Sequence, residues 1–107
     1  MKLIIAIVQD EDASRLVSSL MNEGYSATKL ATTGGFLRAG NVTILIGVKD
    51  DRVQAVIDII GKYSKSRKQV IPTTSEAGIN FYPSMPVEVT VGGATIFVLN
   101  VERFEKV

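Results

Sequence analysis

IIAIVQDE at residues 4–11 and ILIGVKDD at residues 44–51 are two apolar runs that each end in acidic residues. Short runs rich in Ile and Val are typical of buried strands. A helical pattern follows each run, and a further extended stretch follows each helical pattern. The chain therefore contains the same strand–helix–strand unit twice, and this repetition decides its fold class.

Each helical segment has one apolar stripe with the period of an amphipathic helix. The stripe of the first helix consists of Ala13, Leu16, Val17, Leu20 and Met21. We expect the second helix to end near residue 63, and its stripe consists of Val53, Val56, Ile57 and Ile60.

Acidic residues and a glycine mark the predicted helix ends. Asp10 or Asp12 is expected to cap the first helix, because a carboxylate accepts hydrogen bonds from the free N–H groups there. Asp50 or Asp51 is expected to cap the second helix in the same way. Gly24 stands where a left-handed C-terminal cap of the first helix is expected.

The last third of the chain predicts two further strands. EVTVGGATIFVL at residues 88–99 has the pattern of a hairpin, with Gly92 and Gly93 as a two-residue turn that requires positive φ. A short strand is also expected around residues 68–71. The order of elements predicts one α+β domain over residues 1–107, a ferredoxin-like sandwich with two helices on one face of a mostly antiparallel sheet.

The strand patterns predict self-association. A sheet with one face in water should alternate apolar and polar residues, but KLIIAIV (2–8), VTILIGV (42–48) and TIFVLNV (95–101) do not. Two helices can cover only one face. We expect a second copy of the chain to cover the other face, with a folded-over loop as the alternative.

Composition narrows the function classes. The net charge of +1 gives no strong field to attract a nucleic-acid polymer or an anionic membrane. The chain has no Cys and no His, which lowers the prior for an enzyme or a zinc site. No apolar run is long enough to span a bilayer, so we expect a soluble, cytoplasmic protein. Because Cys and His are lacking, we expect neither a metal site nor catalytic residues.

Two loops have the unusual residues. The first loop covers residues 32–41. Its glycines allow a ligand to approach the backbone closely, and its Thr residues offer hydroxyl groups. Its aromatic ring could stack on a base, and its Asn matches the hydrogen-bonding edge of adenine. These residues leave open whether Phe36 and Leu37 tuck against the chain or face a ligand. The second loop, residues 64–86, begins with the basic run SKSRK, which we interpret as a solvated helix end.

Three segments resemble the PII-like cyclic di-AMP receptor proteins of Gram-positive bacteria. They are MKLIIAIVQDED (1–12), ATKLATTGGFLRAGN (27–41) and PVEVTVGGATIFVLNVE (86–102). The resemblance implies a homotrimer with one cyclic di-AMP at each subunit interface, three per trimer. It implies a signal receptor without known catalysis that acts on an unidentified downstream protein, and no cofactor besides the ligand.

The resemblance also implies the ligand-binding residues of this chain. Thr28 should donate or accept a hydrogen bond, Asn41 should read a base edge, and Gly47 should let the ligand lie against a strand. The adenine pocket should be lined by Gly35, Phe36 and Leu37. Relatives often have Arg where this chain has Ser26, so a cation that contacts base or phosphate is missing there, and Lys29 and Arg38 are the candidates to replace it. Ser26 itself and the hydroxyl of Thr32 are further candidate ligand contacts.

Two other functions are compatible with such a fold. A PII-type sensor of ATP or ADP would need basic residues, of which only SKSRK (64–68) and Lys106 are candidates. An enzyme would have to use Lys29, Asp10 or Asp50, but helix capping explains both aspartates.

Overall fold

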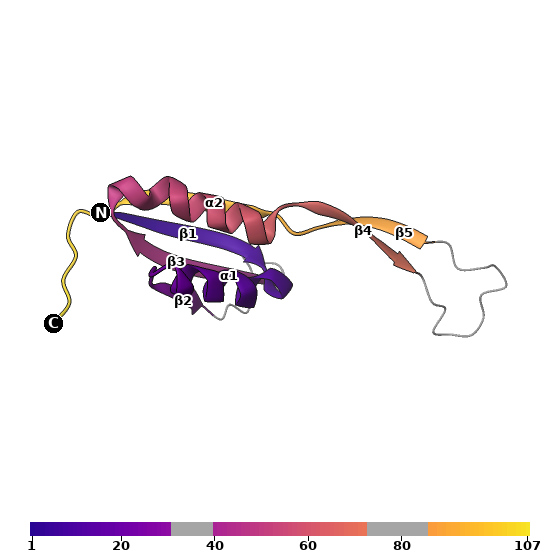
Figure 1. Ribbon diagram of the computed structural model, residues 1–107, viewed down its shortest axis with the longest axis horizontal. Coiled ribbons are helices and arrows are strands. Elements are labelled where there is room, and N and C mark those ends of the chain that lie inside the picture. Colours follow the sequence, from indigo (N-terminus) through magenta and orange to yellow (C-terminus); the bar gives the residue numbers. More distant parts are fainter. Residues whose placement is uncertain (31–39, 73–85) are drawn as a thin grey trace.

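The element order of the structure follows the predicted repeat. The computed structural model describes residues 1–30, 40–72 and 86–107. Its elements are β1 (Lys2–Gln9), α1 (Asp10–Asn22), β2 (Ala27–Leu30), β3 (Asn41–Val48), the 3-10 helix η1 (Asp50–Arg52), α2 (Val53–Ser64), β4 (Arg67–Pro72), β5 (Pro86–Val91) and β6 (Ala94–Asn100) (Figure 1). Both strand–helix–strand units are present, and the strand expected around residues 68–71 is β4.

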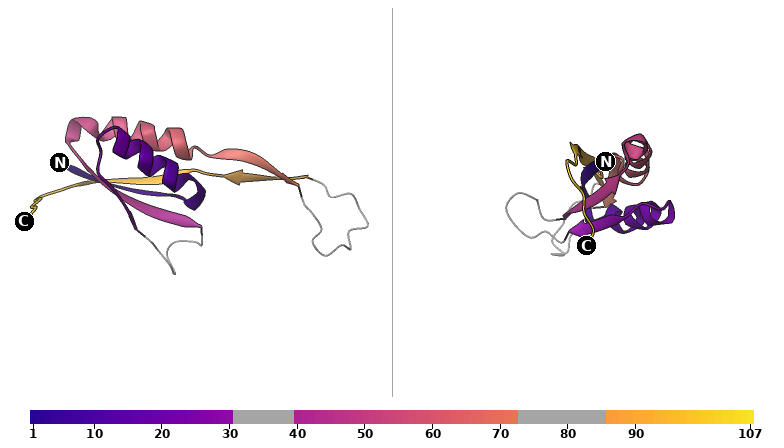
Figure 2. Two further views of the ribbon diagram at one scale, coloured as in Figure 1. Left: turned by 60° about the horizontal axis from the view of Figure 1, so that its bottom comes forward. Right: turned by 90° about the vertical axis from the view of Figure 1, so that its left-hand side faces the viewer.

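Four strands form an antiparallel sheet in the order β2-β3-β1-β6. Helices α1 and α2 lie side by side on one face of this sheet, as the two views in Figure 2 show. The predicted α+β class, with two helices on one face of an antiparallel sheet, is confirmed. Among the described residues, no helix covers the other face of the sheet.

The core lies between the helices and the sheet. The buried side chains of β1 alternate along the strand, as do the buried apolar side chains of β3, and both helices contribute residues of the predicted apolar stripes. In α2, Ile59 packs against the core although the predicted stripe did not include it, and the predicted Ile57 is only partly buried. Burying one Leu or Ile side chain contributes about 1.5–3 kcal/mol, so this layer supplies most of the stability. Its largest members are Ile4, Leu16, Leu20, Ile44, Ile46 and Ile60. Met21, predicted within the first stripe, is instead 61% exposed.

The predicted N-caps are wrong. Gln9 is the N-cap of α1 and Arg52 is the N-cap of α2, and neither has a capping side-chain hydrogen bond. Asp10 and Asp12 lie inside the first turn of α1, where negative charge still favours the helix dipole. Asp50 and Asp51 lie in η1, ahead of α2. The predicted left-handed position is confirmed at Gly24, whose φ is 89°.

The bonds around Gly24 explain why α1 stops there. Gly24 N–H donates to the Met21 carbonyl at 3.0 Å, and Tyr25 N–H donates to the Leu20 carbonyl at 2.9 Å. These two bonds satisfy carbonyls that the last helical turn leaves free, and they require a residue with positive φ between them. The chain then turns back into β2.

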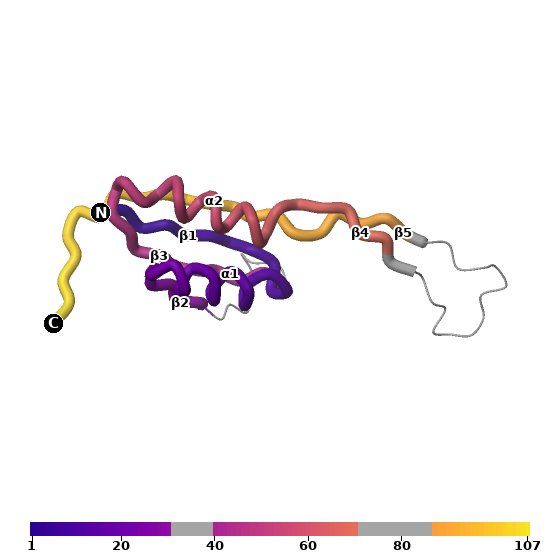
Figure 3. Tube along the Cα trace, in the orientation of Figure 1, coloured from indigo at the N-terminus to yellow at the C-terminus, as the bar shows by residue number. Residues whose placement is uncertain are grey.

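The predicted hairpin at Gly92-Gly93 is also wrong. β5 pairs with β4 in a separate two-stranded ribbon, whereas β6 pairs with β1 in the main sheet. The ribbon projects away from the helices, and Figure 3 shows that the C-terminal segment leaves from the opposite end. Both glycines have positive φ, 81° and 93°, as expected. They form the junction between ribbon and sheet instead of a turn between paired strands.

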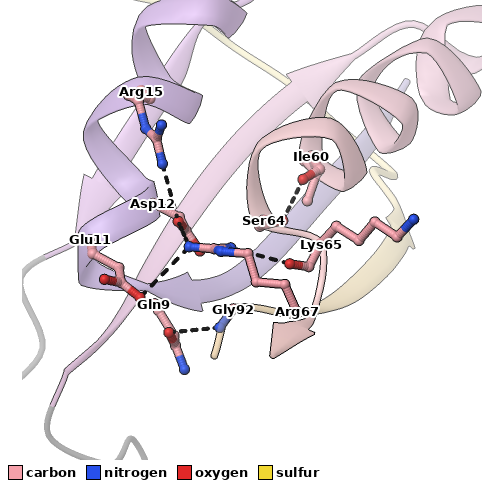
Figure 4. Close-up of polar contacts among 9 residues, drawn as sticks. All are labelled: Gln9, Glu11, Asp12, Arg15, Ile60, Ser64, Lys65, Arg67 and Gly92. Atoms are coloured by element: carbon pink, nitrogen blue, oxygen red, sulfur yellow. Dashed lines mark hydrogen bonds and ion pairs between the residues drawn. The ribbon is translucent and has the colours of Figure 1, made fainter. Parts of the chain in front are cut away.

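A cluster of polar contacts fixes the root of the ribbon (Figure 4). Arg67 of β4 donates to both carboxylate oxygens of Asp12, at 3.0 and 3.5 Å, and to the Lys65 carbonyl at 3.2 Å. Asp12 is fully buried, so losing its partner would leave a buried charge unpaired. The hydrogen bond with Asp12 raises the pKa of Arg67 above its usual value, so the guanidinium stays charged.

Gly92 lies directly over this cluster and has no room for a side chain. A Cβ at Gly92 would lie 2.6 Å from both Arg67 Nη1 and the Lys65 carbonyl oxygen. A Cβ at Gly93 would meet nothing closer than the Ser66 Cβ at 3.9 Å. The two glycines therefore differ in crowding but share a positive φ.

This difference predicts the effect of two matched substitutions. Gly93→Ala should cost about 1–2 kcal/mol of unfolding free energy, because only the backbone conformation is strained. Gly92→Ala should cost more, because the methyl group also displaces Arg67 from Asp12. Urea unfolding at one fixed protein concentration measures both. Equal losses for the two variants would contradict the crowding at Gly92.

Candidate functional site

The predicted ligand residues of β3 lie on the face of the sheet turned away from the helices. Val42, Ile44 and Ile46 are buried under the helices, and the alternation of side chains places Asn41 and Gly47 on the opposite side. We call this side the open face. Asn41 is half-buried and Gly47 is exposed.

Strand β2 adds further predicted residues to the open face. Thr28 is opposite Leu45 in the register, and continuing that register places Ser26 opposite Gly47. Thr28, Ser26 and Gly47 are all exposed, so polar groups are available along the β2–β3 edge. The structure thus brings these three residues together.

Lys29 does not share this location. It is opposite the buried Ile44, and its amine lies 3.7 Å from a carboxylate oxygen of Asp10 at the start of α1. Its charge is therefore directed toward the helix side of the sheet. Because neighbouring residues of a strand point to opposite faces, Lys29 and Thr28 cannot face one flat ligand together.

The predicted residues of the open face extend over a considerable length. Asn41 begins β3 and Gly47 lies near its end, about 20 Å apart at roughly 3.3 Å per residue. Thr28 lies between them, across from Leu45. A ligand that contacts all three must be elongated and must lie along the strand.

The Asn41 end of the open face adjoins the root of the ribbon. Asn41 is opposite Gln9, whose side-chain oxygen accepts a hydrogen bond of 2.8 Å from Gly92 N–H. Two clefts of about 320 and 350 Å³ meet here, and Asn41 and Gln9 line both. Gln9 and Gly92 were not among the predicted site residues. A hairpin turn at Gly92 would have placed this residue away from β1, so the sequence offered no reason to pair it with Gln9.

The Gly47 end adjoins the N-terminus. The ammonium group of Met1 lies 2.8 Å from Asp50 Oδ1, and this hydrogen bond lowers the pKa of the Asp50 carboxyl. A Cβ at Gly47 would lie 3.3 Å from the Met1 methyl carbon. Glycine therefore leaves space on the strand where a larger residue would crowd the anchored N-terminus.

The β1–β6 half of the open face is apolar. The register pairs Leu3 with Leu99 and Ile5 with Phe97 on this side. Phe97 is 50% exposed and Leu99 is 44% exposed, which is unusual for large apolar side chains that stand next to each other. The open face thus has a polar half at β2–β3 and an apolar half at β1–β6.

A larger, basic cleft lies elsewhere, on the helix side at the root of the ribbon. It has a volume of about 550 Å³ and is lined by Arg15, Lys62, Tyr63, Lys65, Ser66 and Arg67. The run SKSRK was interpreted as a solvated helix end, but Arg67 and Arg15 both lie near the buried Asp12, at 3.0 and 3.6 Å. Part of this basic surface therefore has a structural role.

Five predicted ligand residues fall outside the described parts of the chain: Thr32, Gly35, Phe36, Leu37 and Arg38. Within residues 1–30, 40–72 and 86–107, no group of three His, Cys, Asp or Glu side chains is placed to hold a metal ion. No helix in those same ranges is long and apolar enough to cross a membrane.

Two helices on one face of a four-stranded antiparallel sheet are consistent with the PII-like class of folds. A family model described as cyclic-di-AMP receptor matches residues 1–107, and the chain belongs to this family. A crystal structure of a protein from Pediococcus pentosaceus ATCC 25745, described as functionally unknown, is similar. It shares 43% sequence identity with a TM-score of 0.78, and the match covers 99% of this chain and 96% of that chain.

Family membership confirms the resemblance that the three sequence segments suggested. The family supports cyclic di-AMP as the ligand of this chain, and a receptor family implies a binding protein that is not a catalyst.

Proposed function

We propose that the protein is a cyclic di-AMP sensor that binds its ligand on the open face, between the subunits of a cytoplasmic homotrimer. The observation that carries this proposal is the common location of Thr28, Asn41 and Gly47 on the face without helices. Three residues that the family resemblance assigns to the ligand thus lie along one face of the sheet. Family membership supports the choice of ligand.

The two halves of the open face suit different partners. The apolar half, with Leu3, Ile5, Phe97 and Leu99, gains stability when a second subunit removes it from water. The polar half offers a hydroxyl at Thr28 and an amide at Asn41 to a nucleotide. A ligand that lies on the polar half would then be covered by the neighbouring subunit.

The expected adenine contacts follow from the resemblance. An adenine stacks on Phe36 beside Leu37, with Gly35 allowing close approach, and Asn41 hydrogen-bonds its edge. Gly47 lets the distal part of the ligand lie on the strand. The elongated course from Asn41 to Gly47 suits a ligand with two nucleotide units.

The signal is expected to leave the site through the ribbon. Asn41 is opposite Gln9, and Gln9 holds Gly92 at the root of the ribbon. A ligand that engages Asn41 therefore acts next to a contact that positions β5. Ordering of the loops at residues 32–41 and 64–86 would then change the surface presented to a downstream protein.

Substitutions on the polar half should weaken ligand binding. Asn41→Ala and Thr28→Val should each reduce the affinity for cyclic di-AMP about three- to tenfold, the effect of losing one hydrogen bond. Isothermal titration calorimetry measures this directly, and Ser18→Ala on the exposed side of α1 is the matched control. The absence of any binding heat for the unmodified chain would refute the proposed ligand. Displacement of cyclic di-AMP by ATP would favour the alternative PII-type sensor of ATP or ADP.

A charge on the apolar half should separate the subunits. Phe97→Asp should convert the trimer to monomers, because an ionised carboxylate in an apolar interface costs several kcal/mol. Met21→Asp is the control, since Met21 is an exposed apolar residue on the outer side of α1. Sedimentation velocity distinguishes the species. A Phe97→Asp variant that remains a trimer would place the subunit contact elsewhere.

A further inference from the structure

A cleft of about 410 Å³ lies where β3 ends and the chain enters η1. It is lined by Glu23, Gly24, Tyr25, Ser26, Gly47, Val48, Lys49 and Arg52. Two of these, Ser26 and Gly47, belong to the proposed ligand site at its distal end. The same cleft therefore continues from the open face past the end of the sheet, toward two cationic side chains that no ligand role has yet included.

The backbone of η1 explains why Lys49 and Arg52 line the same cleft. Lys49 is the N-cap of this single turn and Arg52 is its last residue, and Arg52 N–H donates to the Lys49 carbonyl at 2.9 Å. This turn brings two residues that are three apart in the chain to one end of β3. Both residues are exposed.

Lys49 and Arg52 have no acidic partner within the described part of the chain. Three other cations near the sheet and the ribbon are compensated: Lys29 lies 3.7 Å from Asp10, Arg67 lies 3.0 Å from Asp12, and Lys68 lies 3.3 Å from Glu88. Among residues 1–30, 40–72 and 86–107, no ion pair includes Lys49 or Arg52. Their charge is therefore available to an anion.

We propose that Lys49 and Arg52 reach back over the Gly47 end of the open face to bind the nearer phosphodiester group of the ligand, and that they supply the positive charge that Ser26 does not. This inference rests on the proposed function, since it concerns the same site. Cyclic di-AMP has two phosphodiester anions, and charge-assisted hydrogen bonds from Lys or Arg are the strongest that a phosphate accepts. Lys29 cannot serve, because its amine lies on the other side of the sheet beside Asp10.

Glu23 should have the opposite effect on ligand binding from Lys49 and Arg52. Its carboxylate lines the same cleft at the end of α1, and it has no ion pair among the described residues. A negative charge there repels a phosphodiester. Removing this charge should strengthen binding, whereas removing either cation should weaken it.

The test compares charge variants by calorimetry with cyclic di-AMP. Lys49→Gln and Arg52→Gln should each weaken binding about tenfold, and the double variant about 100-fold, from the loss of charge-assisted bonds. Glu23→Gln should strengthen binding about two- to threefold. Lys62→Gln on α2, an exposed lysine outside this cleft, should bind like the unmodified chain.

Three further measurements exclude a merely structural effect. Arg52→Lys should retain most of the affinity, because it keeps the charge. The affinity of the double variant should depend less on salt concentration than that of the unmodified chain, because fewer charges are screened. Thermal unfolding without ligand should be unchanged, since both side chains are exposed and without ion pairs within the described residues.

The outcomes separate this inference from the proposed function. If the unmodified chain does not bind cyclic di-AMP, the proposed function itself fails. If the unmodified chain binds and the double variant binds within twofold of it, with the same salt dependence, only the role of Lys49 and Arg52 is overturned.

Discussion

A four-stranded sheet has two faces, and the helices in the described part of this chain cover only one of them. The helix face is closed by the buried residues of β1 and β3 against Leu16, Leu20 and Ile60. On the other face, Phe97 and Leu99 remain about half exposed, in a row with Ile5 and Leu3. The hydrophobic effect favours covering this apolar half with another subunit, and in the proposed trimer the polar β2–β3 half would then lie beside a neighbour. Under this proposal, subunit contact and ligand binding depend on one uncovered surface.

The root of the ribbon links that surface to the remainder of the molecule. Arg67 holds the buried Asp12 from β4, and Gln9 holds Gly92 from the end of β1. Gln9 is also the register partner of Asn41. A ligand contact at one end of β3 is thus separated from the ribbon by a single side chain.

Much of this structure could be predicted from local patterns, and the failures have a common cause. The helical period predicts the apolar stripes of α1 and α2, and the glycine after the first stripe predicts the turn at Gly24. The alternation of side chains along a strand places Asn41 and Gly47 on the same face. The hairpin failed because positive φ at two glycines suits a turn and a junction equally, and only pairing over long sequence distances decides between them. The prediction of Asp12 as a helix cap failed for a similar reason: Asp12 is held by Arg67, which is distant in sequence. The cleft with Lys49 and Arg52 could not be predicted, since it arises only when α1, β3 and η1 meet.

The central claim is that one surface serves both as subunit contact and as ligand site. Native mass spectrometry of the purified chain with excess cyclic di-AMP tests it most directly, because it counts subunits and ligands in one complex. The account predicts a trimer that carries three ligands, with no ligand on residual monomer. A monomer that binds cyclic di-AMP by itself, or a trimer that never retains the ligand, would contradict it.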